Sequence, residues 1–322
     1  MSHAVVIGAG VAGLTVAAEL ADAGHRVTII DRADGLGPAQ CSWWAGGMLA
    51  PWCERESAEQ AVIDLGASAA DWWETRTGGV THNGTLVVAP PQDRRELARF
   101  ARRTETAEEI GADRIAELEP DLAGRFPAGL FFAGEAHLDP RAALTALRDG
   151  LIARGTEIRY GTETPPPADH VFDCRGLAAR NALPDLRGVK GEMLLIRTHD
   201  VTLSRPVRLL HPRHPIYIVP RADGVFMLGA TMIESDDRNR ITARSMLELL
   251  GAAYALHPAF AEAEILETGV DVRPAFPDNL PRLVAQDGRI CVNGLYRHGF
   301  LLSPAMARQA TAMIGGALEA AE

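Results

Sequence analysis

The stretch AVVIGAGVAGLTVAAELADAGHRVTIID, from Ala4 to Asp31, decides the fold of this chain. It opens with a short apolar run that predicts a buried strand, and the segment that follows has the 3.6-residue spacing of a helix. Between them, Gly8, Gly10 and Gly13 give the pattern G-x-G-x-x-G. The first glycine permits a tight turn, the second lets the backbone approach a pyrophosphate, and the third lets helix and strand pack closely. A second apolar run ends at Asp31, so the stretch predicts a βαβ unit that binds a dinucleotide.

The residues at the ends of this unit narrow the choice of ligand. Free backbone N–H groups at the helix start, next to Val11 and Ala12, are placed to hold the phosphates. Asp31, followed by Arg32, ends the second strand, where a carboxylate can accept hydrogen bonds from both ribose hydroxyls of an adenosine. Its charge would repel a 2′-phosphate, so the unit predicts FAD or NAD and leaves both open.

The composition of the chain limits its fold class and its partners. At 322 residues, 47% hydrophobic and 23% charged, it has the profile of a soluble protein of about two domains. The formal net charge of −10 disfavours a nucleic acid or an anionic membrane as partner, because the long-range field repels polyanions. No apolar run reaches the ~18 residues of a membrane helix, and the N-terminal run lacks a basic leader. We therefore expect a cytoplasmic protein without membrane insertion, and homo-oligomer formation stays open.

The four cysteines give no sign of a metal centre. Cys41, Cys53, Cys174 and Cys291 are far apart, with no C-x-x-C pair and no neighbouring ladder of histidines. Zinc sites and disulfide frameworks need closely spaced or paired cysteines. We therefore expect buried or half-exposed free thiols and no metal.

Local patterns predict several helices further along the chain. Residues 93–110 have the spacing of a charged amphipathic helix. Asp139 is placed as the N-cap of a helix over residues 141–154. Ser303 and Pro304 are placed as N-cap and first residue of a final, alanine-rich helix.

Two other segments indicate how the domains are arranged. The strand predicted at 171–174 is followed by Gly176, the same order of strand and glycine as at the N-terminus, so the chain returns there to its first domain. Between residues 190 and 256, alternating strands predict an antiparallel sheet, with a hairpin turn at Ala222–Gly224. The sequence therefore predicts two domains built from interleaved segments.

The segment from Cys41 to Glu54, CSWWAGGMLAPWCE, combines aromatic side chains with paired glycines. Gly46 and Gly47 would allow a flat ligand to approach the backbone closely, and Trp43, Trp44 and Met48 would wall it. An aromatic patch packed in the core explains the segment equally well, so these residues alone leave the two interpretations open.

Five blocks together resemble the FAD-dependent D-amino acid oxidase superfamily, and most closely the glycine oxidases of thiamine biosynthesis. Besides the opening motif, they are SWWAGGMLAP (42–51), IYIVPR (216–221), GVFMLGAT (224–231), VRPAFPDNLPRL (272–283) and YRHGFLLSPA (296–305). The resemblance covers nearly the whole chain in the same block order. It implies an α/β fold, with a Rossmann-like FAD-binding domain from residues 1–75, 139–188 and 265–322. A substrate-binding α+β domain with a mixed or antiparallel sheet would comprise residues 76–138 and 189–264.

The resemblance also implies which residues hold FAD. On this basis the cofactor-binding residues are Gly8, Gly10, Val11, Ala12, Gly13, Asp31, Arg32, Ser42, Ala45, Gly46, Gly47, Met48, Val171, Gly176, Arg273, His298, Gly299, Phe300 and Leu301. The sequence departs from the family at Cys174-Arg175, where a small pair is usual, and before Arg273, where tryptophan-glycine is usual. Because no cysteine stands where sarcosine oxidases attach their flavin, we expect non-covalent FAD.

The resemblance implies three catalytic residues, namely Tyr217, Arg273 and Arg297. A planar guanidinium pairs well with a carboxylate, so Arg273 would bind the substrate carboxylate with help from the Tyr217 hydroxyl. Arg297 would lie near substrate or flavin. His298 is a weaker acid/base candidate, because hydride transfer from a neutral amine requires no dedicated base. Arg221 could equally form an ion pair between domains.

The implied reaction is oxidation of glycine or another small primary or secondary amino acid to the imino acid. Dioxygen would reoxidise FAD and give hydrogen peroxide, in the service of thiamine (thiazole) biosynthesis. Two alternatives stay open: a dehydrogenase of the same fold that passes electrons to a quinone or partner protein, and a non-catalytic FAD- or NAD-binding protein. The sequence does not give the pocket volume that selects the substrate.

Overall fold

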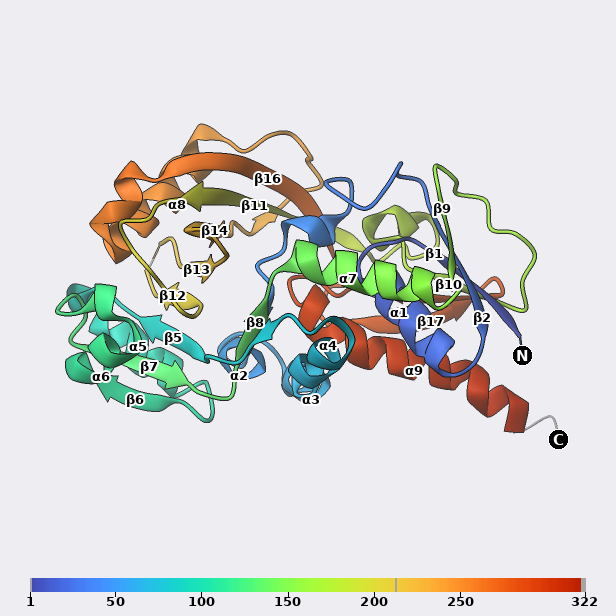
Figure 1. Ribbon diagram of the computed structural model, residues 1–322, viewed down its shortest axis with the longest axis horizontal. Coiled ribbons are helices and arrows are strands. Elements are labelled where there is room, and N and C mark those ends of the chain that lie inside the picture. The colour runs from blue at the N-terminus through green and yellow to red at the C-terminus, as the bar shows by residue number, and fades with distance from the viewer. Residues whose placement is uncertain (1, 212, 320–322) are drawn as a thin grey trace.

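The structure, a computed structural model, describes residues 2–211 and 213–319 in two halves that lie side by side (Figure 1). A six-stranded sheet in the order β17-β18-β10-β1-β2-β9 forms the centre of one half. Its strands are Arg282–Gln286 (β17), Arg289–Asn293 (β18), His170–Asp173 (β10), His3–Ile7 (β1), Arg26–Asp31 (β2) and Glu157–Tyr160 (β9). The sheet is parallel except for the β17–β18 hairpin, so strands from distant segments meet in it.

The predicted βαβ unit is confirmed. β1 pairs in parallel with β2, and the helix between them, α1 (Val11–Asp22), packs against α7 (Pro140–Ala153) and α9 (Gly299–Glu319). A Cβ atom at Gly13 would lie 1.8 Å from the carbonyl oxygen of Gly8. Glycine is therefore required at position 13 for α1 to approach β1 this closely.

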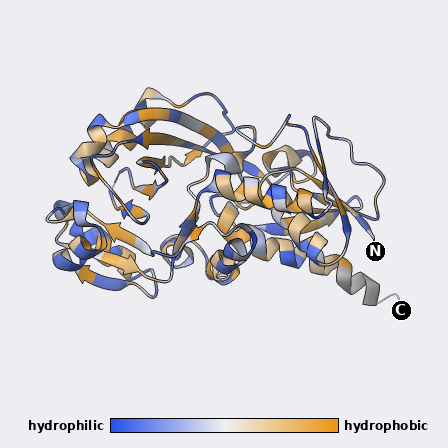
Figure 2. Cartoon of the chain, viewed as in Figure 1, coloured by the Kyte–Doolittle hydropathy of each residue, from blue (hydrophilic) through white to orange (hydrophobic). Residues whose placement is uncertain are grey.

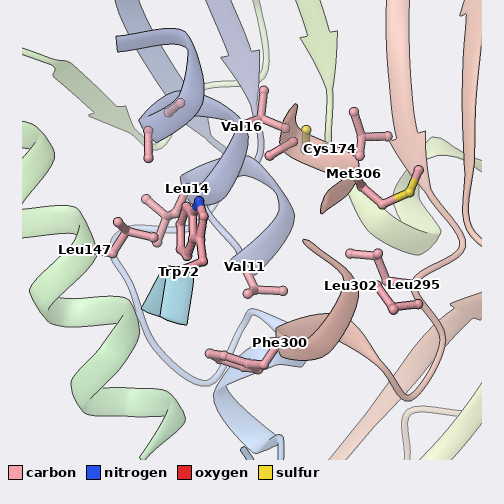
Figure 3. Close-up of a cluster of buried hydrophobic side chains, with 14 of the residues drawn as sticks. Val11, Leu14, Val16, Trp72, Leu147, Cys174, Leu295, Phe300, Leu302 and Met306 are labelled. Carbon is pink, nitrogen blue, oxygen red and sulfur yellow. The ribbon is translucent and has the colours of Figure 1, made fainter. Parts of the chain in front are cut away.

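Apolar side chains from distant segments hold this half together. In Figure 3, Leu14 of α1 lies next to Leu147 of α7 and Trp72 of α4 (Ala69–Thr77), all in one buried cluster. Burying one such side chain contributes about 1.5–3 kcal/mol. The core of this half therefore depends on α1, α4 and α7 packing together.

The start of the last helix differs from the prediction. α9 begins at Gly299, so Ser303 and Pro304 lie inside it and are not its N-cap and first residue. A proline lacks the N–H that would bond the carbonyl four residues earlier, that of Phe300. The Trp73 indole Nε1–H of α4 donates to that oxygen instead, at 2.8 Å. A tertiary hydrogen bond thus replaces the missing helical one. By contrast, Asp139 is confirmed as the N-cap of α7, since its side chain accepts from the backbone N–H groups of residues 141 and 142.

The second half is built on a nine-stranded sheet in the order β15-β11-β14-β13-β12-β5-β7-β6, with β16 paired to β11. Its strands are Thr85–Val88 (β5), Glu108–Gly111 (β6), Ala128–Phe132 (β7), Arg187–Arg197 (β11), Val207–Leu209 (β12), Ile216–Pro220 (β13), Val225–Gly229 (β14), Ile233–Glu234 (β15) and Glu264–Ala275 (β16). The predicted turn between β13 and β14 is confirmed, with positive φ at Asp223 and Gly224. Figure 2 shows hydrophobic residues on most strands of this sheet and many hydrophilic ones on α5 (Arg94–Ala101) beside it.

The predicted helix over residues 93–110 is wrong in its second part. α5 (Arg94–Ala101) ends early, and Thr106 has a φ of 65°, a conformation outside any right-handed helix. The chain then forms β6, which pairs with β7 at the edge of the sheet and buries Ile110. Tertiary pairing with β7 has overridden a charged sequence that by itself favours a helix.

Shorter elements complete the fold. They are the strands Met48–Leu49 (β3), Val80–Thr81 (β4) and Ala136–Leu138 (β8), which form a small sheet, and the helices Pro51–Glu54 (α2), Gln60–Gly66 (α3), Ala112–Leu118 (α6) and Ala243–Leu256 (α8). The domain division stays a prediction, and sheet pairing favours one adjustment to it. β16 pairs with β11 along its length, so we propose that the last FAD-binding segment begins after residue 275, not at 265.

The described residues contain no helix both long and apolar enough to cross a membrane. All four cysteines are free thiols, three buried and Cys41 half-buried, as predicted. No group of three or more histidine, cysteine or carboxylate side chains among residues 2–211 and 213–319 is arranged to hold a metal ion.

Candidate active site

A cavity of about 970 Å³ runs from the glycine-rich turn after β1 to the inner face of the larger sheet. The predicted site residues that line it are Gly8, Gly10, Val11, Ala12, Asp31, Arg32, Ser42, Ala45, Gly46, Gly47, Met48, Gly176, Tyr217, Arg273, Arg297, His298, Gly299, Phe300 and Leu301. The fold therefore brings segments from both ends of the chain to one cavity.

Two predicted cofactor residues do not line this cavity. Gly13 lies beneath Gly8 and serves helix packing. Val171 pairs with Val5 in the β1–β10 ladder and packs against that sheet. The part of this segment that reaches the cavity comes later, at Cys174, Arg175 and Gly176.

The glycine-rich end of the cavity presents backbone donors. Gly8 has a φ of 108°, and a Cβ there would lie 2.7 Å from the Cys174 carbonyl oxygen, so glycine is required. The start of α1 has no side-chain cap at Gly10. Ser42 Oγ accepts from Val11 N at 3.2 Å, and the next N–H groups of the helix have no side-chain partner. An anion at this helix start would meet donors and the positive end of the helix dipole.

Asp31 is already hydrogen-bonded to the backbone around it. One carboxylate oxygen accepts from Ala9 N at 2.6 Å and the other from Ala33 N at 2.8 Å. Each oxygen retains a second lone pair, so the carboxylate is held in place and can still accept from a ligand. Arg32 beside it is exposed and lies 3.9 Å from Glu163.

The segment around Gly46 lines one side of the cavity, and its two glycines leave little space for side-chain atoms. A Cβ at Gly46 would lie 2.8 Å from the ring of Tyr217, and one at Gly47 would lie 2.2 Å from the carbonyl oxygen of Leu138. Close approach of the protein's own chain therefore requires both glycines. Trp44 lines the cavity and lies over Gly269, whose Cβ would be 2.2 Å from its ring.

Arg221 connects this wall to the larger sheet. Its Nη2 donates to the Gly46 carbonyl oxygen at 2.7 Å, and its Nε lies 3.6 Å from Asp139. Arg221 is thus ion-paired, as one of its two interpretations expected, and it joins the residue after β13 to the Gly46 segment and to the start of α7. Trp43, unlike Trp44 and Met48, does not line the cavity, and its ring centre lies 4.8 Å from the Arg141 guanidinium.

Tyr217 stands on the inner face of the larger sheet with room made for its ring. It lies opposite Gly229 of β14, where a Cβ would be 2.9 Å from the ring. On its other side it lies opposite Arg208 of β12. Burial raises the pKa of the Tyr217 hydroxyl, so it remains a hydrogen-bond donor at neutral pH.

Arg273 extends over a gap left by another glycine. Its guanidinium occupies the space where a Gly191 Cβ would be, and its Nη1 donates to the Thr231 carbonyl oxygen at 3.0 Å. Among the described residues, no carboxylate oxygen lies within 4.0 Å of this guanidinium. Arg273 therefore presents an unpaired positive charge to the cavity.

A cluster of four charged or polar side chains lies beside Tyr217, and the sequence pointed to two of them, Arg297 and His298, but missed Glu54 and Arg208 as site residues. Glu54 is ion-paired with Arg297, whose Nη2 lies 2.7 Å from its Oε2, and with Arg208, and the same Oε2 contacts His298 Nε2 at 2.8 Å. Burial alone would raise the pKa of the Glu54 carboxyl, but Arg297 and Arg208 outweigh it and hold that pKa well below its usual range. Burial lowers the pKa of His298, so the imidazole is neutral at neutral pH. We call these four residues the Glu54 cluster.

The Glu54 cluster could not be read from spacing, because its members lie on α2, β12 and the turn before α9. One signal was present: Arg208 interrupts the apolar strand PVRLLH. A charged residue on the inner face of such a strand is rarely buried without a partner.

Comparison with known proteins identifies the family of this chain. The family described as FAD dependent oxidoreductase (DAO) matches residues 3–313. The chain belongs to this family. A Rhizobium etli protein whose name assigns it to thiamine biosynthesis as an oxidoreductase, ThiO, is 62% identical over 94% of this chain and 93% of its own. A glycine oxidase from Pseudomonas aeruginosa is 28% identical over 97% of this chain and 94% of its own.

Solved structures of the family share the fold. Glycine oxidase from Bacillus cereus has a TM-score of 0.82 at 23% identity, covering 98% of this chain and 96% of its own. Iminodiacetate oxidase from Chelativorans has a TM-score of 0.82 at 25% identity, covering 97% and 95%. This DAO-family chain is therefore an FAD-dependent oxidoreductase with the predicted fold class, and the glycine oxidases among its relatives support oxidation of an amine.

The residues of the cavity fit FAD. The uncapped start of α1 and the glycines around it suit a pyrophosphate, and Asp31 is held ready for a ribose. The start of α9, at Gly299 and Phe300, also lines the cavity, and its N-terminal N–H groups would stabilise negative charge on a reduced flavin ring. When bound, FAD supplies the two-electron acceptor that no side chain provides.

Proposed function

We propose that this enzyme oxidises glycine, or another small primary or secondary amino acid, to its imino acid, with O₂ reduced to H₂O₂. The observation that carries this proposal is the unpaired Arg273 guanidinium, in the same cavity as Tyr217 and the glycine-rich turn. We further propose that the enzyme acts in the cytoplasm and contributes to thiazole formation for thiamine, and the name of the Rhizobium etli relative supports the link to thiamine biosynthesis. The cavity suits an amino acid because the Arg273 guanidinium and the neutral Tyr217 hydroxyl both line it, and both are donors for a carboxylate.

In the proposed mechanism the chain's own residues bind and orient the substrate. Arg273 pairs its guanidinium fork with the substrate carboxylate, and the Tyr217 hydroxyl donates to the same group. Two contacts to one carboxylate fix the direction of the Cα–H bond, which suits transfer of a hydride out of that bond. Loss of the hydride leaves an iminium, which water converts to the oxo acid and ammonia if no other nucleophile takes it first.

We also propose that FAD is held without a covalent bond. The cysteines that line the cavity are Cys41 and Cys174. Burial raises the pKa of the Cys41 thiol to about 12 and that of Cys174 well above its usual range. Since the thiolate is the nucleophile, neither side chain is suited to attack a flavin at neutral pH.

A substrate panel tests the proposed function. The purified holoenzyme is mixed anaerobically with glycine, sarcosine, D-alanine, D-proline and larger D-amino acids, and bleaching of the flavin is followed. Air is then admitted and peroxide is measured. We expect the smallest amino acids to bleach the flavin fastest and air to restore it with stoichiometric peroxide.

Each other outcome identifies an alternative. A bleached flavin that air restores slowly, and a quinone restores quickly, would make the protein a dehydrogenase. A flavin that no amino acid bleaches would contradict the proposal and leave a non-catalytic FAD-binding protein.

A further inference from the structure

The side chains around Tyr217 carry more positive than negative charge. In the Glu54 cluster one carboxylate faces the guanidiniums of Arg208 and Arg297, while His298 is neutral. One surplus positive charge therefore remains in the cluster, on two guanidiniums whose side chains are partly exposed. Arg273, without a carboxylate partner, adds a second.

Strand register places this charge next to the proposed substrate position. Arg208 and Tyr217 are directly opposite each other in the antiparallel β12–β13 pair, so their side chains leave the same face of the sheet. Burial raises the pKa of the Tyr217 hydroxyl, and among the charges acting on it Arg273, Arg208 and Arg297 lower that pKa while Glu54 raises it. The same four groups must act on a small molecule bound against the Tyr217 hydroxyl.

An amino acid in water is a zwitterion, and hydride can leave only when its nitrogen carries a lone pair. The amine is one carbon away from the carboxylate, so it enters the same positive field. We propose that the surplus charge of the Glu54 cluster selects the substrate with a neutral amine, by disfavouring the ammonium form in the complex. The proton leaves to bulk water as the substrate binds, and no base in the chain is needed.

This inference rests on the proposed function and assigns a role to each of two residues, Arg208 and Glu54. Arg208 supplies the surplus charge, and Glu54 limits it while holding both guanidiniums in place. Neither residue has to touch the substrate. They are positioning residues that act through the electrostatic field.

Two other ionisable groups, Glu135 and Asp271, could also affect the pH dependence, so their titration has to be distinguished from the effect of the cluster. Burial raises the pKa of Glu135 to about 7, and this carboxyl accepts from Cys53 N at 2.7 Å, next to Glu54. Burial raises the pKa of Asp271, whose carboxylate lies 3.4 Å from Arg238. Because Glu135 titrates near neutral pH, Glu135→Gln serves as the background in which the charge variants are also measured.

The test uses two substitutions that remove opposite charges from one ion pair. The rate of anaerobic flavin reduction at saturating glycine is measured against pH, since its acid limb reports the amine pKa in the complex. Arg208→Gln removes a positive charge, so the limb moves to higher pH by about one unit. Glu54→Gln removes a negative charge, so the limb moves to lower pH by about one unit. Arg208→Lys retains the charge and keeps the limb in place, and Arg208→Met repeats the charge loss with an apolar stem.

A binding measurement gives an independent readout. Glycolate carries the carboxylate without the amine, and its dissociation constant is measured from the change it causes in the flavin spectrum. We expect Arg208→Gln to weaken glycolate binding and Glu54→Gln to strengthen it, each about tenfold, since one pH unit and a factor of ten are the same free energy.

The outcomes separate this inference from the proposed function. If both substitutions move the acid limb in the same direction, or leave it in place, the cluster is only structural and the inference is overturned while the function stands. If no amino acid reduces the wild-type flavin, the proposed function fails and the inference fails with it.

Discussion

At the glycine-rich end of the cavity the key residues come from one stretch, Ala4–Asp31, and act mainly through backbone N–H groups. At the Tyr217 end they come from α2, β12, β13, β16 and the turn before α9, and act through side-chain charge. A cofactor site of this kind tolerates little change in backbone shape. A site made of charges tolerates substitutions that keep the fold but alter its field. Damage at the first end should therefore remove the flavin, and damage at the second should leave it bound.

The largest effect is expected for Gly13→Val. The added side chain would start 1.8 Å from the Gly8 carbonyl oxygen, so α1 cannot dock on β1. We expect loss of soluble, flavin-containing protein. Gly10→Ala is the matched control, since its Cβ would meet nothing closer than Ser42 Oγ at 3.5 Å. Gly10→Ala should fold as the wild type by circular dichroism while retaining less flavin. Normal flavin content in Gly13→Val would contradict the view that the glycine-rich end depends on backbone shape.

Arg273→Ala should affect only the substrate end. Removing a bidentate, charge-assisted contact of about 3–5 kcal/mol should raise KM roughly 100-fold or more. The visible spectrum of the bound flavin should not change. Steady-state kinetics and the spectrum are the two measurements, and Arg273→Lys should recover part of the lost affinity because it restores charge without the fork. An unaltered KM would remove Arg273 from the site.

Two buried carboxyls near the cavity should respond oppositely to pH. The pKa of Glu135 is raised to about 7, from 4.5 in an unfolded chain, mainly by burial. The folded state then binds more protons between these values, so wild-type stability falls as pH rises through that window. Glu135→Gln lacks this fall, and its free energy of unfolding should gain on the order of 3 kcal/mol relative to wild type between pH 5 and pH 8.

Glu54→Gln is the control for that measurement. The pKa of Glu54 is depressed, so its stabilising effect is fully present above 4.5 and is lost only as pH falls below that value. The difference between Glu54→Gln and wild type should therefore be constant from pH 5 to pH 8. Urea unfolding at several pH values measures both variants, and parallel curves for the two would contradict the assignment.

The smallest effect is expected for the hydrogen bond between Trp73 of α4 and the start of α9. Trp73→Phe removes the donor to the Phe300 carbonyl and leaves that buried oxygen unpaired at the start of α9. We expect a loss of about 1–2 kcal/mol in the free energy of unfolding. Trp72→Phe removes a bond to Glu19, which stays paired with Arg76, so its effect should be smaller. Thermal or urea unfolding that ranks Trp72→Phe as the more damaging change would contradict this account.

The same contrast explains what the sequence could reveal. The βαβ unit, the cap at Asp139 and the alternating strands of the larger sheet are set by neighbours in the chain, and local patterns predicted them. The start of α9 depends on Trp73, far away in sequence, and residues 108–110 depend on pairing with β7. Pro304 was therefore interpreted as a helix start, although the bond it lacks is replaced from α4.

Within the site, the resemblance pointed to residues that line the cavity where those residues belong to a named block. Tyr217 and Arg273 lie in such blocks, and both line the cavity. Arg208 belongs to none of them, and Glu54 ends a segment whose aromatic residues dominated its interpretation. What joins these two is strand register and helix position, which appear only once the chain is folded.

The Tyr217 ring occupies space that a Cβ would take at two positions, Gly46 and Gly229, each within 3.0 Å of the ring. The two glycines come from separate segments of the chain, so the place of this ring depends on both. Replacing side chains around this tyrosine would therefore create little space for bulkier substrates. Space has to be made at another wall, and Met232, an exposed and flexible side chain lining the same cavity, is the place to begin.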